Sequence, residues 1–164
     1  MEKSHTKLEE IKLVGLKVRT NNKNELGSLK GKIPPLVQQY FHQQLFNKIP
    51  NRKNPGTTLC VYTDYESDHT GDYTYYIGEA VTSFDHLPKD LETLTIPTQN
   101  YTKFTTKPNP MPKVLTDAWT DILKMSPKDL NGHRAYRADF EVYDERASDH
   151  NKMILDIYIG LKPD

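Results

Sequence analysis

The chain has 164 residues, a length that can bury one hydrophobic core without disulfides or metals, and we expect a single domain over residues 1–164. Its 22 Lys and Arg balance its 22 Asp and Glu, so no net charge favours direct binding to nucleic acid or to an anionic membrane. Because Cys60 is the single cysteine, the N-terminus is polar and no apolar run could span a bilayer, we expect a cytoplasmic protein.

The first half predicts one strand, one helix and two strands. Residues 8–18 alternate apolar and polar positions, as a strand does, and end at a turn-rich segment. From residue 33 to residue 49 the apolar positions recur at helical spacing, with two prolines in the first turn, where a helix tolerates them. Residues 58–67 and 73–83 are β-rich and flank a loop of hairpin length that contains Gly71.

The second half predicts the same order. Residues 91–107 read as extended, 112–125 as helical, and 134–145 and 153–162 as two strands. The apolar spacing that starts at Leu36 in the first helix starts again 78 residues later, at Val114. We interpret this as two β-α-β-β repeats, at about 8–84 and 90–162. The predicted fold is α+β, with one antiparallel-rich sheet, two helices on one face and a ligand cleft on the other.

An acid among aromatic residues is the most informative local feature. Alternation puts Phe140 and its apolar neighbours on one side of a strand, which we expect to face the helices, and Glu141 and Tyr143 on the other, with Tyr62 and Cys60 of a second strand. A carboxylate surrounded by aromatic rings suits a lipophilic cation. The alternative is an acid that faces water beside a Lys or Arg, and strand alternation leaves both open.

Several segments together resemble the gyrase-inhibitor-like family of small-molecule-binding domains. These segments are "GTTLCVYTDYESDHTGDYTYYIGEAV", "TIPTQNYTKF", "DAWTDIL", "RADFEVYDERA" and "ILDIYIGLK", which cover nearly the whole chain. The same module is the effector-binding domain of AraC-type and multidrug-responsive regulators, and this chain is similar to its stand-alone, integron-associated branch. The resemblance implies a duplicated fold with a ligand cleft between the repeats.

The resemblance also implies the ligand-binding residues. The acid of the "FE.Y" motif, which pairs with cationic aromatic ligands, maps onto Glu141, and two aromatic walls map onto Tyr62 and Trp119. We add further aromatic residues, and the complete set of expected ligand contacts is Glu141, Tyr62, Trp119, Tyr143, Tyr76 and Phe41. No cofactor is expected.

Two departures from the family pattern affect these expectations. Val37 stands where relatives commonly carry a tryptophan in the first helix, which predicts an enlarged or reshaped cleft. In relatives a glycine often precedes the tyrosine that corresponds to Tyr101, whereas this chain has Asn100, preceded by Gln99. The resemblance therefore does not predict the turn geometry at this point.

Two function classes remain open from the sequence. One is a binding module that captures or senses an amphipathic, cationic compound and signals to a separate transcription regulator, without contacting DNA itself. The other is a hydrolase of strained electrophilic compounds, because some gyrase-inhibitor-like proteins are described so. In that class Glu141, with a pKa raised by apolar surroundings, would position or deprotonate a water.

Other candidate sites carry weaker signals. The loop with Asp64, Glu66, Asp68 and Asp72 resembles a calcium loop, but its glycine and final residue are misplaced for one, and a solvated hairpin loop is the favoured interpretation. No metal site is expected. Cys60 is either a nucleophile without an identified histidine or, as we favour, a small buried hydrophobe.

Overall fold

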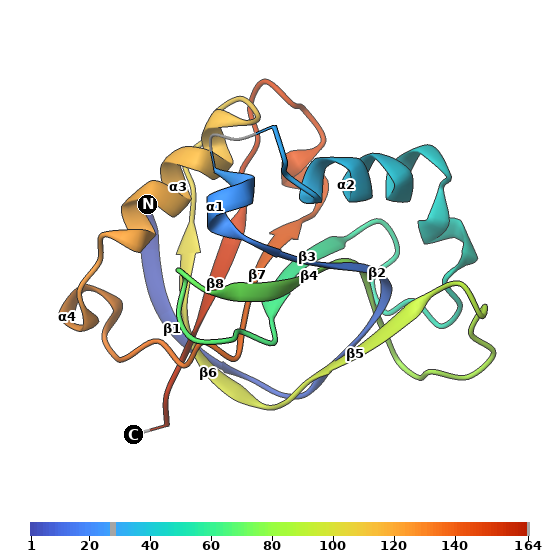
Figure 1. The fold of residues 1–164 in the computed structure, drawn as a ribbon, viewed down its shortest axis with the longest axis horizontal. Coiled ribbons are helices and arrows are strands. Elements are labelled where there is room, and N and C mark those ends of the chain that lie inside the picture. The colour runs from blue at the N-terminus through green and yellow to red at the C-terminus, as the bar shows by residue number, and fades with distance from the viewer. Residues whose placement is uncertain (27–28, 164) are drawn as a thin grey trace.

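The computed structural model describes residues 1–26 and 29–163, which form an α+β fold around one eight-stranded antiparallel sheet (Figure 1). The predicted fold class is confirmed. The strands are β1 (Glu2–Leu8), β2 (Ile11–Asn21), β3 (Thr58–Thr63), β4 (Asp72–Val81), β5 (Glu92–Ile96), β6 (Gln99–Thr105), β7 (Ala138–Tyr143) and β8 (Asp156–Leu161). The helices are α1 (Asn22–Glu25), α2 (Ile33–His42), α3 (Lys113–Leu123) and α4 (Pro127–Leu130), with short 3-10 turns η1 (Leu45–Lys48) and η2 (Glu145–Ala147).

The strand order has the symmetry expected of a duplication. The order β1-β6-β8-β7-β3-β4-β2-β5 reads the same from the other end when the strands of the two halves are exchanged. The two halves meet at the β3–β7 pair in the middle of the sheet. Each leading strand pairs with the opposite half, β1 with β6 and β5 with β2, so the halves are interlocked.

Helices α2 and α3 lie on the same face of the sheet, α3 at the left and α2 at the right of the view (Figure 1). Tyr40 of α2 is completely buried in a cluster with Cys60 and Ile77 of the sheet. Ala118 and Ile122, on the apolar stripe of α3, pack in a second cluster with strand β8. The two helices therefore cover neighbouring parts of one sheet face, one over each half.

The position predicted for the cleft, on the face without helices, is wrong. Phe140 packs in a cluster with Val61 and Tyr101, to which the described helices contribute no residue, and its ring stacks on Tyr158 at 4.6 Å between centroids. Glu141 therefore points to the helix side. The error has a physical cause: both faces of the central strands are buried, so apolar side chains do not identify the face that the helices cover.

Several element boundaries also differ from the prediction. The helix expected over residues 33–49 ends at His42, because Gln44 adopts a left-handed backbone with φ of 50°, and η1 follows. The polar N-terminus, for which no strand was predicted, forms β1 at the sheet edge. The extended segment over residues 91–107 is divided into β5 and β6, and Asn100 lies within β6, paired with Leu161.

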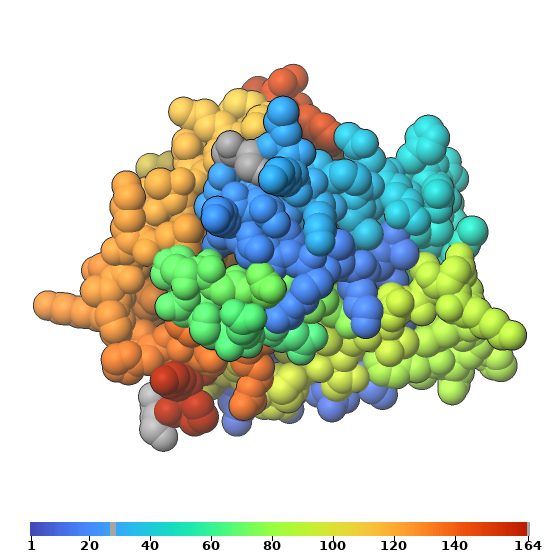
Figure 2. Space-filling model, in the orientation of Figure 1, coloured from blue at the N-terminus to red at the C-terminus, as the bar shows by residue number. Residues whose placement is uncertain are grey.

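The loop between β3 and β4 packs against α1. In the space-filling view this loop (green) lies beside the residues around α1 (blue) (Figure 2). Asn22 donates a hydrogen bond to the carbonyl of His69 at 3.0 Å and accepts one from the Tyr73 hydroxyl at 3.0 Å. Among the described residues, no helix is long and apolar enough to cross a membrane.

Candidate functional site

Glu141 lies at the centre of the sheet, on the face that the helices cover. It belongs to β7 and is only 1% exposed. Its neighbours across the ladder are Cys60 on β3 and Ile157 on β8. None of the ion pairs found within residues 1–26 and 29–163 includes Glu141. The carboxylate is thus buried without a cationic side chain beside it.

Three aromatic side chains donate hydrogen bonds to this acid instead. The Tyr62 hydroxyl lies 2.5 Å and the Trp119 indole nitrogen 2.7 Å from Oε2, and the Tyr143 hydroxyl lies 2.7 Å from Oε1. The rings of Tyr62 and Trp119 meet edge to face, 5.2 Å between centroids. Because Trp119 comes from α3 and the tyrosines from β3 and β7, the acid joins both halves of the molecule.

The electrostatics of this cluster follow from burial. Removal from water raises the pKa of Glu141, and the hydrogen bonds from Tyr62, Tyr143 and Trp119 oppose that rise. Burial, together with the nearby Glu141 charge, raises the pKa of Tyr62 and of Tyr143 well above the ordinary tyrosine value. Both hydroxyls therefore keep their protons at neutral pH and remain donors.

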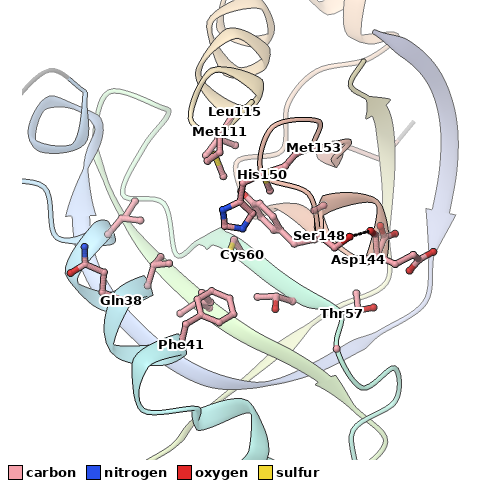
Figure 3. A pocket seen from close by; sticks show the side chains of 18 of the residues that line it. Gln38, Phe41, Thr57, Cys60, Met111, Leu115, Asp144, Ser148, His150 and Met153 are labelled. Carbon is pink, nitrogen blue, oxygen red and sulfur yellow. Dashed lines mark hydrogen bonds between the residues drawn. The ribbon is translucent and has the colours of Figure 1, made fainter. Parts of the chain in front are cut away.

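A cavity of about 820 Å³ opens beside this cluster, between α2 and the start of α3. Figure 3 shows Gln38 and Phe41 of α2, Met111 just before α3, Leu115 of α3, and His150 and Met153 before β8 around one space that Cys60 also borders. A volume of this size accommodates a drug-sized molecule. The lining residues are Ile33, Pro34, Val37, Gln38, Phe41, Pro55, Gly56, Thr57, Thr58, Cys60, Tyr75, Ile77, Met111, Leu115, Tyr143, Asp144, Glu145, Ala147, Ser148, His150 and Met153.

Tyr143 connects the cavity with the buried acid. Its side chain lines the cavity, and its hydroxyl holds Glu141. Glu141, Tyr62 and Trp119 are not among the described residues that line the cavity, so they form a layer behind Tyr143. The lining includes the acids Asp144 and Glu145 but, within the described part of the chain, no Lys or Arg. Because Asp144 is paired with Arg146 at 2.9 Å, Glu145 supplies the remaining negative charge of the described lining.

The structure brings together most of the predicted contacts. Glu141, Tyr62, Trp119 and Tyr143 form the hydrogen-bonded cluster, whereas Phe41 lines the cavity mouth and is 47% exposed. The placement of Tyr76 in the cleft is wrong. Because side chains alternate along β4, Tyr76 points to the opposite face. There it packs in a cluster whose buried members are Leu13, Leu59, Val61, Tyr76, Ile96, Tyr101, Ala138 and Phe140.

The structure also locates the residues that depart from the family pattern. Val37 lines the cavity on α2, where a tryptophan would fill part of it. Gln99 is buried, its side-chain nitrogen donates to the Ala138 carbonyl at 3.0 Å, and it occupies the space that a side chain at Gly160 would need.

Sequence reasoning missed much of the cavity wall. Met111, His150 and Met153 come from segments outside the strands, and nothing in their local sequence marks them as cavity residues. Tyr75 and Ile77 could have been found, because they share a strand face with period two. Cys60 also lines the cavity, and burial followed by the Glu141 charge raises the pKa of its thiol, which disfavours the nucleophilic thiolate.

The acidic loop between β3 and β4 serves its own turn. Asp68 accepts hydrogen bonds from the backbone and hydroxyl of Thr70, and Asp72 accepts one from Asn21. Within residues 1–26 and 29–163, no three His, Cys, Asp or Glu side chains lie where they could hold a metal ion together.

Comparison with known families agrees with this geometry. Residues 6–161 match the family model Cass2, described as integron-associated effector binding protein. The chain belongs to this family. The bacterial relatives include "Putative transcriptional regulator protein YobU" of Bacillus subtilis (strain 168), which is 27% identical over 157 residues, 96% of each chain.

Solved structures share the fold of this effector-binding family member. An integron cassette protein from the mobile metagenome of Vibrio cholerae is 24% identical, with a TM-score of 0.76 over 98% of this chain and 95% of that one. The protein SAV2435, solved bound to tetraphenylphosphonium, is 18% identical, with a TM-score of 0.78 over 99% and 94% of the two chains.

Proposed function

We propose that this protein binds amphipathic, aromatic cations in the cavity between α2 and α3, with Glu141 as the counter-charge, and acts as a drug-sensing accessory to a separate transcription regulator. The observation that carries the proposal is the environment of Glu141. The acid is buried beside a cavity, and three aromatic donors surround it without any cation among the described side chains.

The energetics of that acid support a cationic ligand. Burying an unpaired carboxylate is costly, and a cation that enters the cavity would recover part of that cost. Aromatic rings near the cavity add cation–π attraction of roughly 0.5–2 kcal/mol each. Since Tyr143 lies between cavity and acid, the bound cation acts either across its ring or after the side chain turns aside.

The relatives supply the chemistry to test first. Tetraphenylphosphonium, the ligand of SAV2435, is a lipophilic aromatic cation without N–H groups. Its charge can be neutralised by a carboxylate whose oxygens already accept hydrogen bonds, as those of Glu141 do. The name of YobU supports the link to transcription regulation, for which this chain would supply the ligand signal.

Titration of Trp119 fluorescence tests the proposal. Trp119 is the single tryptophan, and its indole donates directly to Glu141. We expect wild type to bind tetraphenylphosphonium and to reject tetraphenylborate, which has nearly the same shape and the opposite charge. Glu141→Gln should weaken the cation at least tenfold, whereas the exposed Glu92→Gln control should leave it unchanged.

Two results would contradict the proposal. Equal affinity for the cation and the borate would show that shape, and not charge, drives binding. Unchanged affinity in Glu141→Gln would remove the acid as a counter-charge. Recovery of the ligand with its mass unchanged separates binding from the hydrolase hypothesis, which requires a product.

A further inference from the structure

A second buried acid lies on the same sheet face as Glu141. Glu79 of β4 is 1% exposed, and burial raises its pKa. It follows Ile77 by two residues, so both point to the helix side, and Ile77 lines the cavity. None of the sequence patterns identified Glu79, and the proposed function does not use it.

The hydrogen-bonding capacity of Glu79 is incompletely filled. Its Oε2 has only long contacts, 3.4 Å from the Gly56 nitrogen and 3.6 Å from the Arg52 guanidinium. Its Oε1 has no hydrogen-bond partner among the described residues, and neither has the hydroxyl of Tyr40, which is completely buried nearby. A buried carboxylate oxygen without a donor is costly, so the space beside Glu79 and Tyr40 suits a ligand that brings a hydrogen-bond donor.

Glu79 is not among the described lining residues and lies behind the cavity wall, next to residues that do line it. Gly56, which donates to it, is a lining residue, and so are Val37 and Phe41 on either side of Tyr40 along α2. The ladder aligns Glu141 with Cys60 and Cys60 with Ile77. Glu79 is therefore two strands across and two residues along from Glu141, which places the two Cα atoms roughly 12 Å apart.

The two acids differ in what they can accept. Both oxygens of Glu141 already receive hydrogen bonds, so this acid suits a diffuse cation without N–H groups. Oε1 of Glu79 lacks a donor among the described side chains and can accept one. Amidinium, guanidinium and primary ammonium groups carry both the charge and the N–H donors that such an oxygen binds most strongly.

We propose that Glu79 is a second anchor of the cavity, so that the effectors of this protein include elongated aromatic dications with one end near Glu141 and an N–H-bearing cationic end at Glu79. This inference rests on the proposed function. The Arg52 guanidinium lies 3.6 Å from Oε2 of Glu79, and the Arg52 side chain is 26% exposed. It can therefore turn toward solvent when a ligand enters.

Matched probes test the second anchor. The dication 4′,6-diamidino-2-phenylindole carries two amidinium groups on a rigid aromatic body, and 6-amidino-2-phenylindole lacks one of them. We expect wild type to bind the diamidine at least tenfold more tightly than the monoamidine. In Glu79→Gln this preference should fall to about twofold or less, while tetraphenylphosphonium affinity should change by less than twofold.

Other results overturn the inference. Equal affinity of wild type for the two amidines, or an equal loss of all three cations in Glu79→Gln, would remove the second anchor and leave the proposed function standing. If wild type binds none of the cations, the proposed function fails and the inference fails with it.

A second variant covers the case in which Glu79→Gln does not fold. Glu79→Asp keeps the charge but withdraws it by one methylene, so we expect it to weaken the diamidine severalfold and to spare tetraphenylphosphonium. An unchanged diamidine affinity in Glu79→Asp, with normal folding by circular dichroism, would contradict the inference.

Discussion

The indole nitrogen of Trp119 lies 2.7 Å from Oε2 of Glu141, and this single hydrogen bond ties α3 to the middle of the sheet. The helix that forms one side of the cavity is thereby connected to the acid behind it. A charge that approaches Glu141 must alter the electrostatic environment of the Trp119 indole. The fluorescence of Trp119 therefore reports directly on ligand binding.

The hydroxyl of Tyr143 should set the pH range of cation binding. Its hydrogen bond lowers the pKa of Glu141 against the effect of burial, so Tyr143→Phe should raise that pKa further. Because only the ionised acid neutralises a cation, the pH at which tetraphenylphosphonium affinity is half-maximal should move upward. Fluorescence titrations at several pH values between about 5 and about 9 measure this half-maximal pH. The range starts near the ordinary pKa of Glu because burial can only move the midpoint upward from there. Tyr76→Phe, on the opposite face, is the matched control, and an unshifted profile in Tyr143→Phe would contradict the expectation.

Glu141 should lower the stability of the ligand-free protein as pH rises. Its folded pKa is raised, so between the unfolded value of about 4.3 and the folded value the native state holds more protons than the unfolded state. Stability from this group is therefore present at low pH and is lost as pH rises through the folded pKa. Calorimetry should show Glu141→Gln melting above wild type at pH 8, with the margin shrinking toward pH 5. A margin independent of pH would show that Glu141 does not titrate in this way.

The ion pair of Arg134 and Asp139 should be among the most sensitive sites for stability. The two side chains are 8% and 0% exposed and meet at 2.7 Å. Arg134→Met would leave a buried carboxylate without its cation, which costs about 3–5 kcal/mol of unfolding free energy. Lys113→Met, in the exposed pair with Asp117, should cost less than about 0.5 kcal/mol. Urea denaturation compares them, and similar losses in both variants would refute the expectation.

The close approach of β2 and β4 should tolerate no side chain at Gly78. A Cβ there would lie 2.0 Å from the Val14 carbonyl oxygen, so backbone would have to move. Gly78→Ala should destabilise the fold by about 1–3 kcal/mol, as overpacking does, and Thr95→Ala on the exposed edge strand serves as the control. Chemical denaturation of both variants provides the test, which a neutral Gly78→Ala would fail.

Residue patterns alone predicted much of this protein. Period-two and helical spacing identified the strands and helices that carry the site, and the recurrence from Leu36 to Val114 predicted the duplicated order that the sheet shows. Alternation also grouped Glu141 with Tyr143 and Tyr62 on one face, because a strand fixes which side chains share a side irrespective of what covers them.

Only the tertiary structure decided what covers that face. Strands β3 and β7 bury both of their faces. The sequence pattern therefore does not identify whether the helices cover the face with Phe140 or the face with Glu141. The exchange of β1 and β5 between halves, and the approach of His150 and Met111 to the cavity, depend on contacts between distant segments. The same holds for the bond from Trp119 to Glu141 and for the unfilled oxygen of Glu79, since local sequence fixes the direction of a side chain but not the partner that it meets.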